Sequence, residues 1–155
     1  MSAKDKRAIE VPAPLVFIAF LLLGYVFNLL LPIRFSAPRT PIVTLGVIFL
    51  VSAVLLAVSA FREMRKAGTS PNPAKLPIRL VVDGPFSFTR NPIYISFALG
   101  YTGIALIFET LWSLPFLAIA LILVDRLIVA KEEQLLKASF GEDYARYKSK
   151  VRRWI

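Results

Sequence analysis

Residues 41–61 read PIVTLGVIFLVSAVLLAVSAF and contain no charged side chain. A helix of this length rises about 30 Å, which is the thickness of the hydrocarbon core of a bilayer. The stretch therefore predicts a transmembrane helix. The whole chain has the same character, because 57% of its residues are hydrophobic, whereas soluble domains have about 45–50%. Its mean hydropathy is +0.66.

Three further apolar segments are long enough to be membrane spans, at residues 12–31, 92–108 and 111–130. The last continues through KEEQLLKASF without a helix breaker, so we expect its helix to extend into the cytoplasm. The sequence thus predicts an all-α integral membrane protein with four transmembrane helices and a long cytoplasmic loop. The chain has 155 residues, which is a usual length for one domain, so we expect a single membrane domain over residues 1–155.

Basic residues mark the expected cytoplasmic side. The N-terminal Lys4, Lys6 and Arg7 precede an apolar run that is too long for a signal peptide, so we expect a retained first helix. Between and after the apolar runs, basic residues concentrate in the 62–91 connection and in the tail, and only Arg34 and Arg39 precede the second span. This bias predicts that both termini and the 62–91 connection are cytoplasmic. The six basic residues of the connection are Arg62, Arg65, Lys66, Lys75, Arg79 and Arg90.

The composition excludes several classes of function. The net charge of +9 would favour nucleic-acid binding in a soluble protein, but here the charges flank membrane spans, so no nucleic-acid partner is expected. The chain has no cysteine and no histidine, and we therefore expect no metal site and no thiol or Ser-His-Asp chemistry. The connection contains Pro71, Pro73 and Pro77 and is predicted to be a loop rather than a helix.

The stretch GPFSFTRNPIY, residues 84–94, places polar residues at the mouth of the third span. Pro92 suits the first turn of a helix, whose free amides and dipole form an anion site. Arg90 adds a planar donor fork for a carboxylate or phosphate. An alternative interpretation makes Arg90 a membrane-surface anchor, Asn91 an N-cap and Tyr94 an interfacial aromatic.

The fourth span ends in a second group of charges. Asp125 and Arg126 interrupt an apolar run, and Glu132 and Glu133 follow at its cytoplasmic mouth. Charges at that depth are costly and should face a cavity or each other. The alternative is an ion-pair ladder along the helix that includes Lys131. The tail FGEDYARYKSKVRRWI, with its tyrosines and tryptophan among basic residues, is expected to lie on lipid headgroups.

Two motifs in order carry a resemblance to a known family. LVVDGPFSFTRNPIY at residues 80–94 and EEQLLKASFGEDYARYKSKVRRW at residues 132–154 resemble the isoprenylcysteine carboxyl methyltransferase family, to which phospholipid N-methyltransferases are related. The resemblance implies a membrane enzyme that uses S-adenosylmethionine, with a cofactor-binding region over residues 66–154. It implies Arg90 and Glu132 as catalytic residues. The implied cofactor contacts are Ile78, Arg79, Leu80, Val81, Phe86, Asn91, Pro92, Ile93, Tyr94 and Glu132.

Three positions depart from the family pattern. Asn91 stands where the family has histidine, and Phe86 replaces a tyrosine. Ile128 occupies the position of an arginine that the eukaryotic-type enzymes direct at substrate. Asp125 and Arg126 remain candidate substrate contacts, and the isoprenylcysteine substrate itself is not supported.

The residues fit the implied chemistry. Glu132 is suited to hold an ammonium, and the helix beginning at Pro92 a carboxylate. The expected partners are the lipid bilayer, in a prokaryotic cell membrane, and a lipid-like or amphipathic methyl acceptor that enters sideways. Two alternatives are an NADPH-dependent membrane reductase, which shares an Arg-x-Pro-x-Tyr element, and a non-enzymatic scaffold or lipid-binding protein.

Overall fold

The fold is all-helical across the part of the chain that the computed structural model describes, residues 12–33, 38–70 and 77–155. Seven residues named above lie outside these ranges: Lys4, Lys6, Arg7, Arg34, Pro71, Pro73 and Lys75. Within the described ranges the elements, in order, are α1 (Ala13–Leu30), α2 (Arg39–Lys66), η1 (Gly84–Ser87), α3 (Pro92–Ile107), α4 (Ser113–Leu123), η2 (Val124–Val129) and α5 (Ala130–Lys150). The all-α prediction is therefore confirmed.

Three of the helical segments are long and apolar enough to cross a membrane. They are α1, α2 and the continuous run of α4, η2 and α5, in agreement with a multi-pass membrane protein. The third predicted span, residues 92–108, corresponds to α3, which is apolar but has 16 residues. Its length is about 24 Å at the usual rise per residue, so it is shorter than the other three.

Glycines set the closest contacts between these helices. A Cβ on Gly103 of α3 would lie 2.7 Å from the carbonyl oxygen of Gly46 in α2. A Cβ on Gly24 of α1 would lie 2.6 Å from the hydroxyl of Ser113 in α4. Lipid tails are as apolar as the side chains, so close backbone packing rather than the hydrophobic effect drives such contacts in a membrane. Both helix pairs therefore depend on the absence of a side chain.

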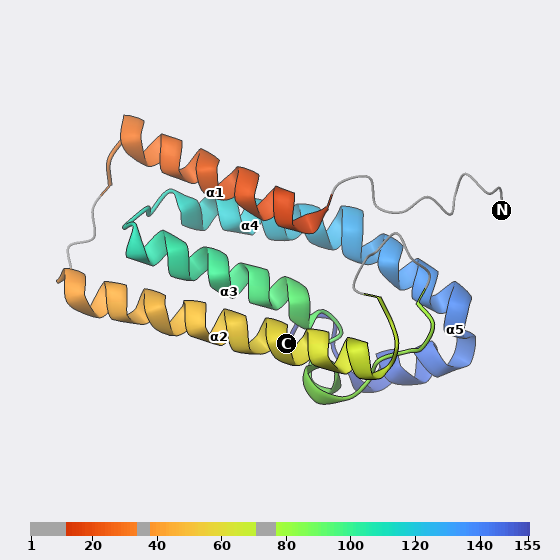
Figure 1. Cartoon of the computed structure of the whole chain (residues 1–155). Helices are drawn as coiled ribbons and strands as arrows, with labels where there is room; N and C mark the ends of the chain where they lie inside the picture. The colour runs from red at the N-terminus through yellow and green to blue at the C-terminus, as the bar shows by residue number, and fades with distance from the viewer. Residues whose placement is uncertain (1–11, 34–37, 71–76) are drawn as a thin grey trace.

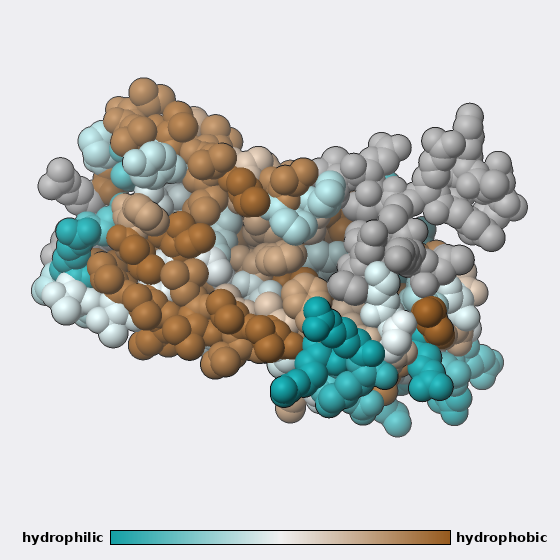
Figure 2. Space-filling view, viewed as in Figure 1, coloured by the Kyte–Doolittle hydropathy of each residue, from teal (hydrophilic) through white to brown (hydrophobic). Residues whose placement is uncertain are grey.

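The two ends of the bundle differ. The helices α1 to α4 lie side by side, and one end of the bundle carries the end of α1, the start of α2 and the connection between α3 and α4 (Figure 1). At the other end the start of α3, the run from η2 into α5 and the C-terminus come together (Figure 1). Hydrophobic residues cover the visible faces of α1 and α2, and hydrophilic residues gather at the end that carries α5 (Figure 2).

The end of α5 corrects one sequence interpretation. The helical run continues through KEEQLLKASF to Lys150, but Gly141 adopts φ 50° and ψ −118° and kinks it. Such a backbone conformation strongly favours glycine. Beyond the kink the chain doubles back toward the bundle (Figure 1). Tyr144 and Tyr147 are then 2% and 8% exposed, so the expectation that these tyrosines lie on headgroups is wrong.

Candidate functional site

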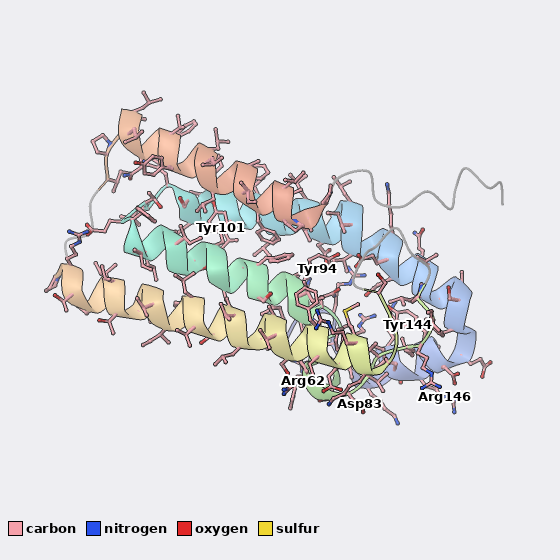
Figure 3. The ribbon with its side chains drawn as sticks, viewed as in Figure 1. Arg62, Asp83, Tyr94, Tyr101, Tyr144 and Arg146 are labelled. Carbon is pink, nitrogen blue, oxygen red and sulfur yellow. The ribbon has the colours of Figure 1, made fainter. Side chains whose placement is uncertain are left out.

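The polar end of the bundle is built from three segments that are distant in the sequence. They are residues 84–94, residues 124–133 and residues 144–154, which together we call the polar cap. Tyr94 lies at the bundle end of this region and Tyr144 further out (Figure 3). The hydrogen bonds and ion pairs among these segments place five carboxylates and guanidinium groups close to one another.

Tyr94 and Glu132 form the first contact. The Tyr94 hydroxyl, in the first turn of α3, donates a hydrogen bond of 2.6 Å to Oε1 of Glu132 in α5. A hydroxyl-to-carboxylate bond of this length is charge-assisted and is among the stronger side-chain hydrogen bonds. Both residues belong to the predicted cofactor set, so the structure brings these two together from the two motifs.

Arg90 contacts the neighbouring glutamate instead. Its Nη1 lies 2.8 Å from Oε1 of Glu133, and the two side chains are 9% and 11% exposed. The same Nη1 donates a 3.0 Å hydrogen bond to the hydroxyl of Tyr144. The Nε of Arg90 is buried and has no hydrogen-bond partner among the described residues. Arg90 is therefore a buried ion-pair partner and not an exposed membrane anchor.

Arg153 pairs with two carboxylates at once. Its Nε and Nη2 lie 3.0 and 2.7 Å from the two oxygens of Glu133, and its Nη1 lies 3.1 Å from Oδ1 of Asp125. Trp154 donates to the same Asp125 oxygen through Nε1 at 2.9 Å. The hydrogen bonds that Arg153 donates to Glu133, followed by the negative charges of Glu133 and Asp125, raise the pKa of Arg153, so the guanidinium stays protonated.

Main-chain atoms of residues 152 and 153 contact the start of α3. The carbonyl oxygen of Arg153 accepts hydrogen bonds from Oγ1 of Thr89 at 3.1 Å and from Nδ2 of Asn91 at 2.9 Å. The amide of Arg90 donates to the carbonyl of Arg152 at 3.0 Å. Asn91 occupies the N-cap position of α3 without a side-chain capping bond. The alternative interpretation is therefore confirmed for the N-cap position, although the amide side chain of Asn91 bonds to the carbonyl of Arg153 and makes no capping bond.

A π-helical turn orients the acidic residues. The six residues of η2, Val124–Val129, form a π-helix between two α-helices. The wider turn shifts the residues that follow it relative to α4 and is often found at functional sites. Asp125, inside the turn, and Glu133, after it, both contact Arg153. Val124 and Val129 are meanwhile fully buried in the core.

Glu132 differs from the other two acids in its charge environment. Asp125 and Glu133 each pair with at least one arginine. Glu132 makes no salt bridge with any residue in the described ranges, and its recorded partner there is the neutral Tyr94 hydroxyl. A half-buried carboxylate without a cation is costly. The arrangement thus presents one carboxylate that a cationic ligand would neutralise.

Several predicted cofactor contacts take no part in the side-chain ion pairs of the polar cap. Ile78 is 74% exposed, and Arg79 bonds through its main chain to the Thr69 hydroxyl. Leu80, Val81 and Phe86 are half-buried, and the carbonyl of Phe86 accepts a 2.7 Å bond from Tyr147. Pro92 is buried and Ile93 is half-buried at the start of α3.

The two candidate substrate residues are separated by the structure. Asp125 is part of the polar cap, whereas the Arg126 side chain is 81% exposed and its Nε lies 3.9 Å from Asp125. Lys131 is exposed and has no salt bridge within the described ranges, so the alternative of an ion-pair ladder along the helix is wrong. Among the described residues no group of three acidic side chains is arranged to hold a metal ion.

Sequence reasoning did not single out Arg153, Trp154, Tyr144 and Tyr147 as site residues. Their signal was the C-terminal motif itself, which contains all four of these residues. The kink at Gly141 is what brings them back to the bundle. An open hollow of about 760 Å³ lies along the end of α2, lined by Val58, Phe61, Arg62, Arg65 and Lys66.

Comparison with known proteins relates this chain to membrane methyltransferases. Residues 41–143 match the model of a family described as phospholipid methyltransferase. The match includes α2, α3 and Glu132, and it does not single out the isoprenylcysteine carboxyl methyltransferases.

Individual relatives match over shorter segments. The nickel-cobalt-cadmium resistance protein NccN of Alcaligenes xylosoxydans xylosoxydans is 35% identical over 69 residues, which cover 43% of this chain and 32% of the relative. The cobalt-zinc-cadmium resistance protein CzcN of Cupriavidus metallidurans has the same identity and coverage. An uncharacterized protein of Haemophilus influenzae is 41% identical over 51 residues, which cover 30% of this chain and 81% of the relative. The matched part is about a third of the length of the two resistance proteins. No solved structure matches the chain.

Proposed function

Because the chain belongs to the phospholipid methyltransferase family, we propose that it is an integral membrane methyltransferase that uses S-adenosylmethionine. The proposed acceptor is a lipid-like or amphipathic molecule at the cytoplasmic face of the membrane. The proposed cofactor-binding region is residues 66–154 of a single membrane domain. The more specific resemblance to isoprenylcysteine carboxyl methyltransferases rests on the two motifs at residues 80–94 and 132–154.

The observation that carries this proposal is the environment of Glu132. Its carboxylate receives a hydrogen bond from Tyr94 and has no salt bridge with a described residue, while Glu133 beside it pairs with two arginines. S-adenosylmethionine carries an ammonium and a sulfonium. A carboxylate that lacks a cation at the mouth of a membrane bundle is suited to hold the ammonium.

Other residues of the polar cap have roles consistent with this ligand. The amide groups in the first turn of α3, after Asn91 and Pro92, are suited to a carboxylate. The half-buried Leu80, Val81 and Phe86 provide apolar surface for a purine ring. Arg90 lies at the same helix start, fixed by Glu133. S-adenosylmethionine supplies an activated methyl group when bound, so the protein has to orient the reactants and exclude water.

The acceptor is proposed from the surface around the site. The end of α2 combines apolar and basic side chains along one open hollow, with Val58 and Phe61 preceding Arg62, Arg65 and Lys66. This order suits an amphipathic molecule whose apolar part remains in the bilayer. The basic residues also support the cytoplasmic orientation of the polar cap in a prokaryotic cell membrane, with α3 as a fourth, shorter span.

Ligand-dependent thermal unfolding tests the proposal. Detergent-purified protein is heated with and without S-adenosylhomocysteine, in parallel with Glu132→Gln and with Glu142→Gln as the matched control. Glu142 is exposed on the same helix. Ligand at 100 times its dissociation constant should stabilise the native protein by about 2.7 kcal/mol. We expect the stabilisation in the native protein and in the Glu142 variant and its loss in the Glu132 variant.

Other outcomes point to the alternatives. Stabilisation by NADPH and not by S-adenosylhomocysteine would support a membrane reductase. No stabilisation by either ligand would support a scaffold or lipid-binding protein. Equal stabilisation of the native protein and both variants would retain the cofactor but remove Glu132 from its site.

A further inference from the structure

Arg153 bonds through its side chain to two carboxylates of the continuous run from η2 into α5. Its guanidinium bridges Asp125 in η2 and Glu133 in α5, with nitrogen-to-oxygen distances between 2.7 and 3.2 Å. The side chain is 33% exposed, and that of Glu133 is 11% exposed. A planar guanidinium can engage two carboxylates in a fixed geometry, which an ammonium cannot do. The side chain of Arg153 therefore fixes the C-terminal segment to the continuous helix that η2 and α5 form.

The main chain of the same residue holds the start of α3. The carbonyl oxygen of Arg153 accepts bonds from Thr89 and Asn91, which are 6% and 8% exposed. Thr89 also pairs with Arg152 in an isolated parallel bridge. Trp154 packs against the apolar core of the bundle. Arg153 thus contacts both the start of α3, which carries Tyr94, and α5, which carries Glu132.

We propose that Arg153 is a positioning residue that fixes the start of α3 against the start of α5. Glu132 and Glu133 lie in the first turn of α5 and Tyr94 lies in the first turn of α3, so the 2.6 Å contact between Tyr94 and Glu132 depends on this spacing. Arg153 also shares Oε1 of Glu133 with Arg90. It therefore acts on Arg90 and Glu132 through Glu133, without a contact of its own to the cofactor. This inference rests on the proposed function.

Arg152 offers a matched control. It is adjacent in the sequence, carries the same charge and is exposed, and its recorded contacts in the described structure are made by main-chain atoms. The comparison is between Arg153→Gln and Arg152→Gln, each with its lysine counterpart. The measurement is the dissociation constant of S-adenosylhomocysteine by calorimetry, with size-exclusion profile and far-UV circular dichroism as checks of folding.

Arg153→Gln should weaken S-adenosylhomocysteine binding about tenfold or more, since a displacement of about 1 Å at a binding group has effects of this order. Arg153→Lys keeps the charge and should recover part of this loss. Arg152→Gln should leave binding within about twofold of the native value. In the double variant Arg153→Gln with Glu133→Gln, the loss should be close to that of Glu133→Gln alone, because both act through one contact.

The outcomes separate this inference from the proposed function. Native protein that does not bind S-adenosylhomocysteine overturns the proposed function and this inference with it. Native binding that Arg153→Gln retains overturns the positioning role alone, as do additive losses in the double variant. If Arg153→Gln does not fold, Arg153→Lys is compared with Arg152→Lys. A loss of affinity for S-adenosylhomocysteine of about threefold or more in Arg153→Lys alone then supports the positioning role. Equal affinities of the two lysine variants overturn it.

Discussion

The apolar bundle and the polar cap are held together by different forces. In the bundle, the closest approaches occur where a helix lacks a side chain, at Gly103 against Gly46 and at Gly24 against Ser113. In the polar cap, the contacts are charge-assisted bonds between residues that are far apart in the sequence, such as Arg153 with Glu133 and Arg90 with Glu133. Close helix packing determines the arrangement of the bundle in lipid, and ion pairs determine which segments of the polar cap associate.

The difference shows why a cofactor site would form at this end. Lipid-facing helices offer apolar surface that accepts many ligands weakly. In the polar cap, arginines neutralise the carboxylates of Asp125 and Glu133. Glu132 has only the neutral hydroxyl of Tyr94 as a partner among the described residues. Charge balance in the rest of the cap is therefore what makes the unpaired carboxylate selective for a cation.

The largest effect on stability is expected from Glu133→Gln. This change leaves Arg90, which is 9% exposed, and Arg153 without their shared carboxylate. Removing one partner of a buried ion pair costs about 3–5 kcal/mol, because the remaining charge stays buried without compensation. Unfolding of the detergent-solubilised variant by heat or denaturant should show a loss of this size.

Glu142→Gln provides the control for this prediction. It removes the same charge from α5 at an exposed position and should leave the unfolding transition unchanged. A loss for Glu133→Gln that does not exceed that of the control would mean that the polar cap is held by packing, as the bundle is.

A pair of glycine substitutions tests the bundle in the same way. Gly103→Ala would place a Cβ 2.7 Å from the Gly46 carbonyl oxygen and 2.8 Å from Leu50, and such overpacking costs about 1–3 kcal/mol. Gly100→Ala, one turn earlier in α3, would place a Cβ 3.7 Å from Ala53. It should be neutral or stabilising, since alanine is the better helix former. Equal effects of the two variants on the free energy of unfolding would contradict close helix packing at Gly103.

Much of the fold could be predicted from the sequence because membrane spans follow from local composition. The runs at residues 12–31 and 41–61 match α1 and the apolar part of α2, since about 20 apolar residues have few other stable solutions. The π-helical turn at Val124–Val129 could not be predicted. It depends on tertiary contacts of Asp125 and on the buried Val124 and Val129, and no local pattern distinguishes it from an α-helix.

The candidate site could be predicted only where both residues of a contact belong to the two sequence motifs. The contact between Tyr94 and Glu132 joins residues that both motifs supplied. The role of Arg153 was hidden, because an amphipathic tail is equally consistent with a membrane surface and with a helix that folds back. The left-handed conformation of Gly141 decides between them, and a glycine in a sequence does not reveal which way the chain turns.

The smallest effect is expected from Arg126→Gln. This side chain is 81% exposed, and its distance of 3.9 Å from Asp125 is long for an ion pair. Surface pairs of this kind contribute little, since both groups remain solvated and mobile. The variant should unfold like the native protein and bind S-adenosylhomocysteine equally well, as measured by calorimetry. Weaker cofactor binding would bring Arg126 into the polar cap. Weaker methyl transfer at unchanged cofactor affinity would instead restore Arg126 as a contact of the acceptor, next to Asp125 of the polar cap.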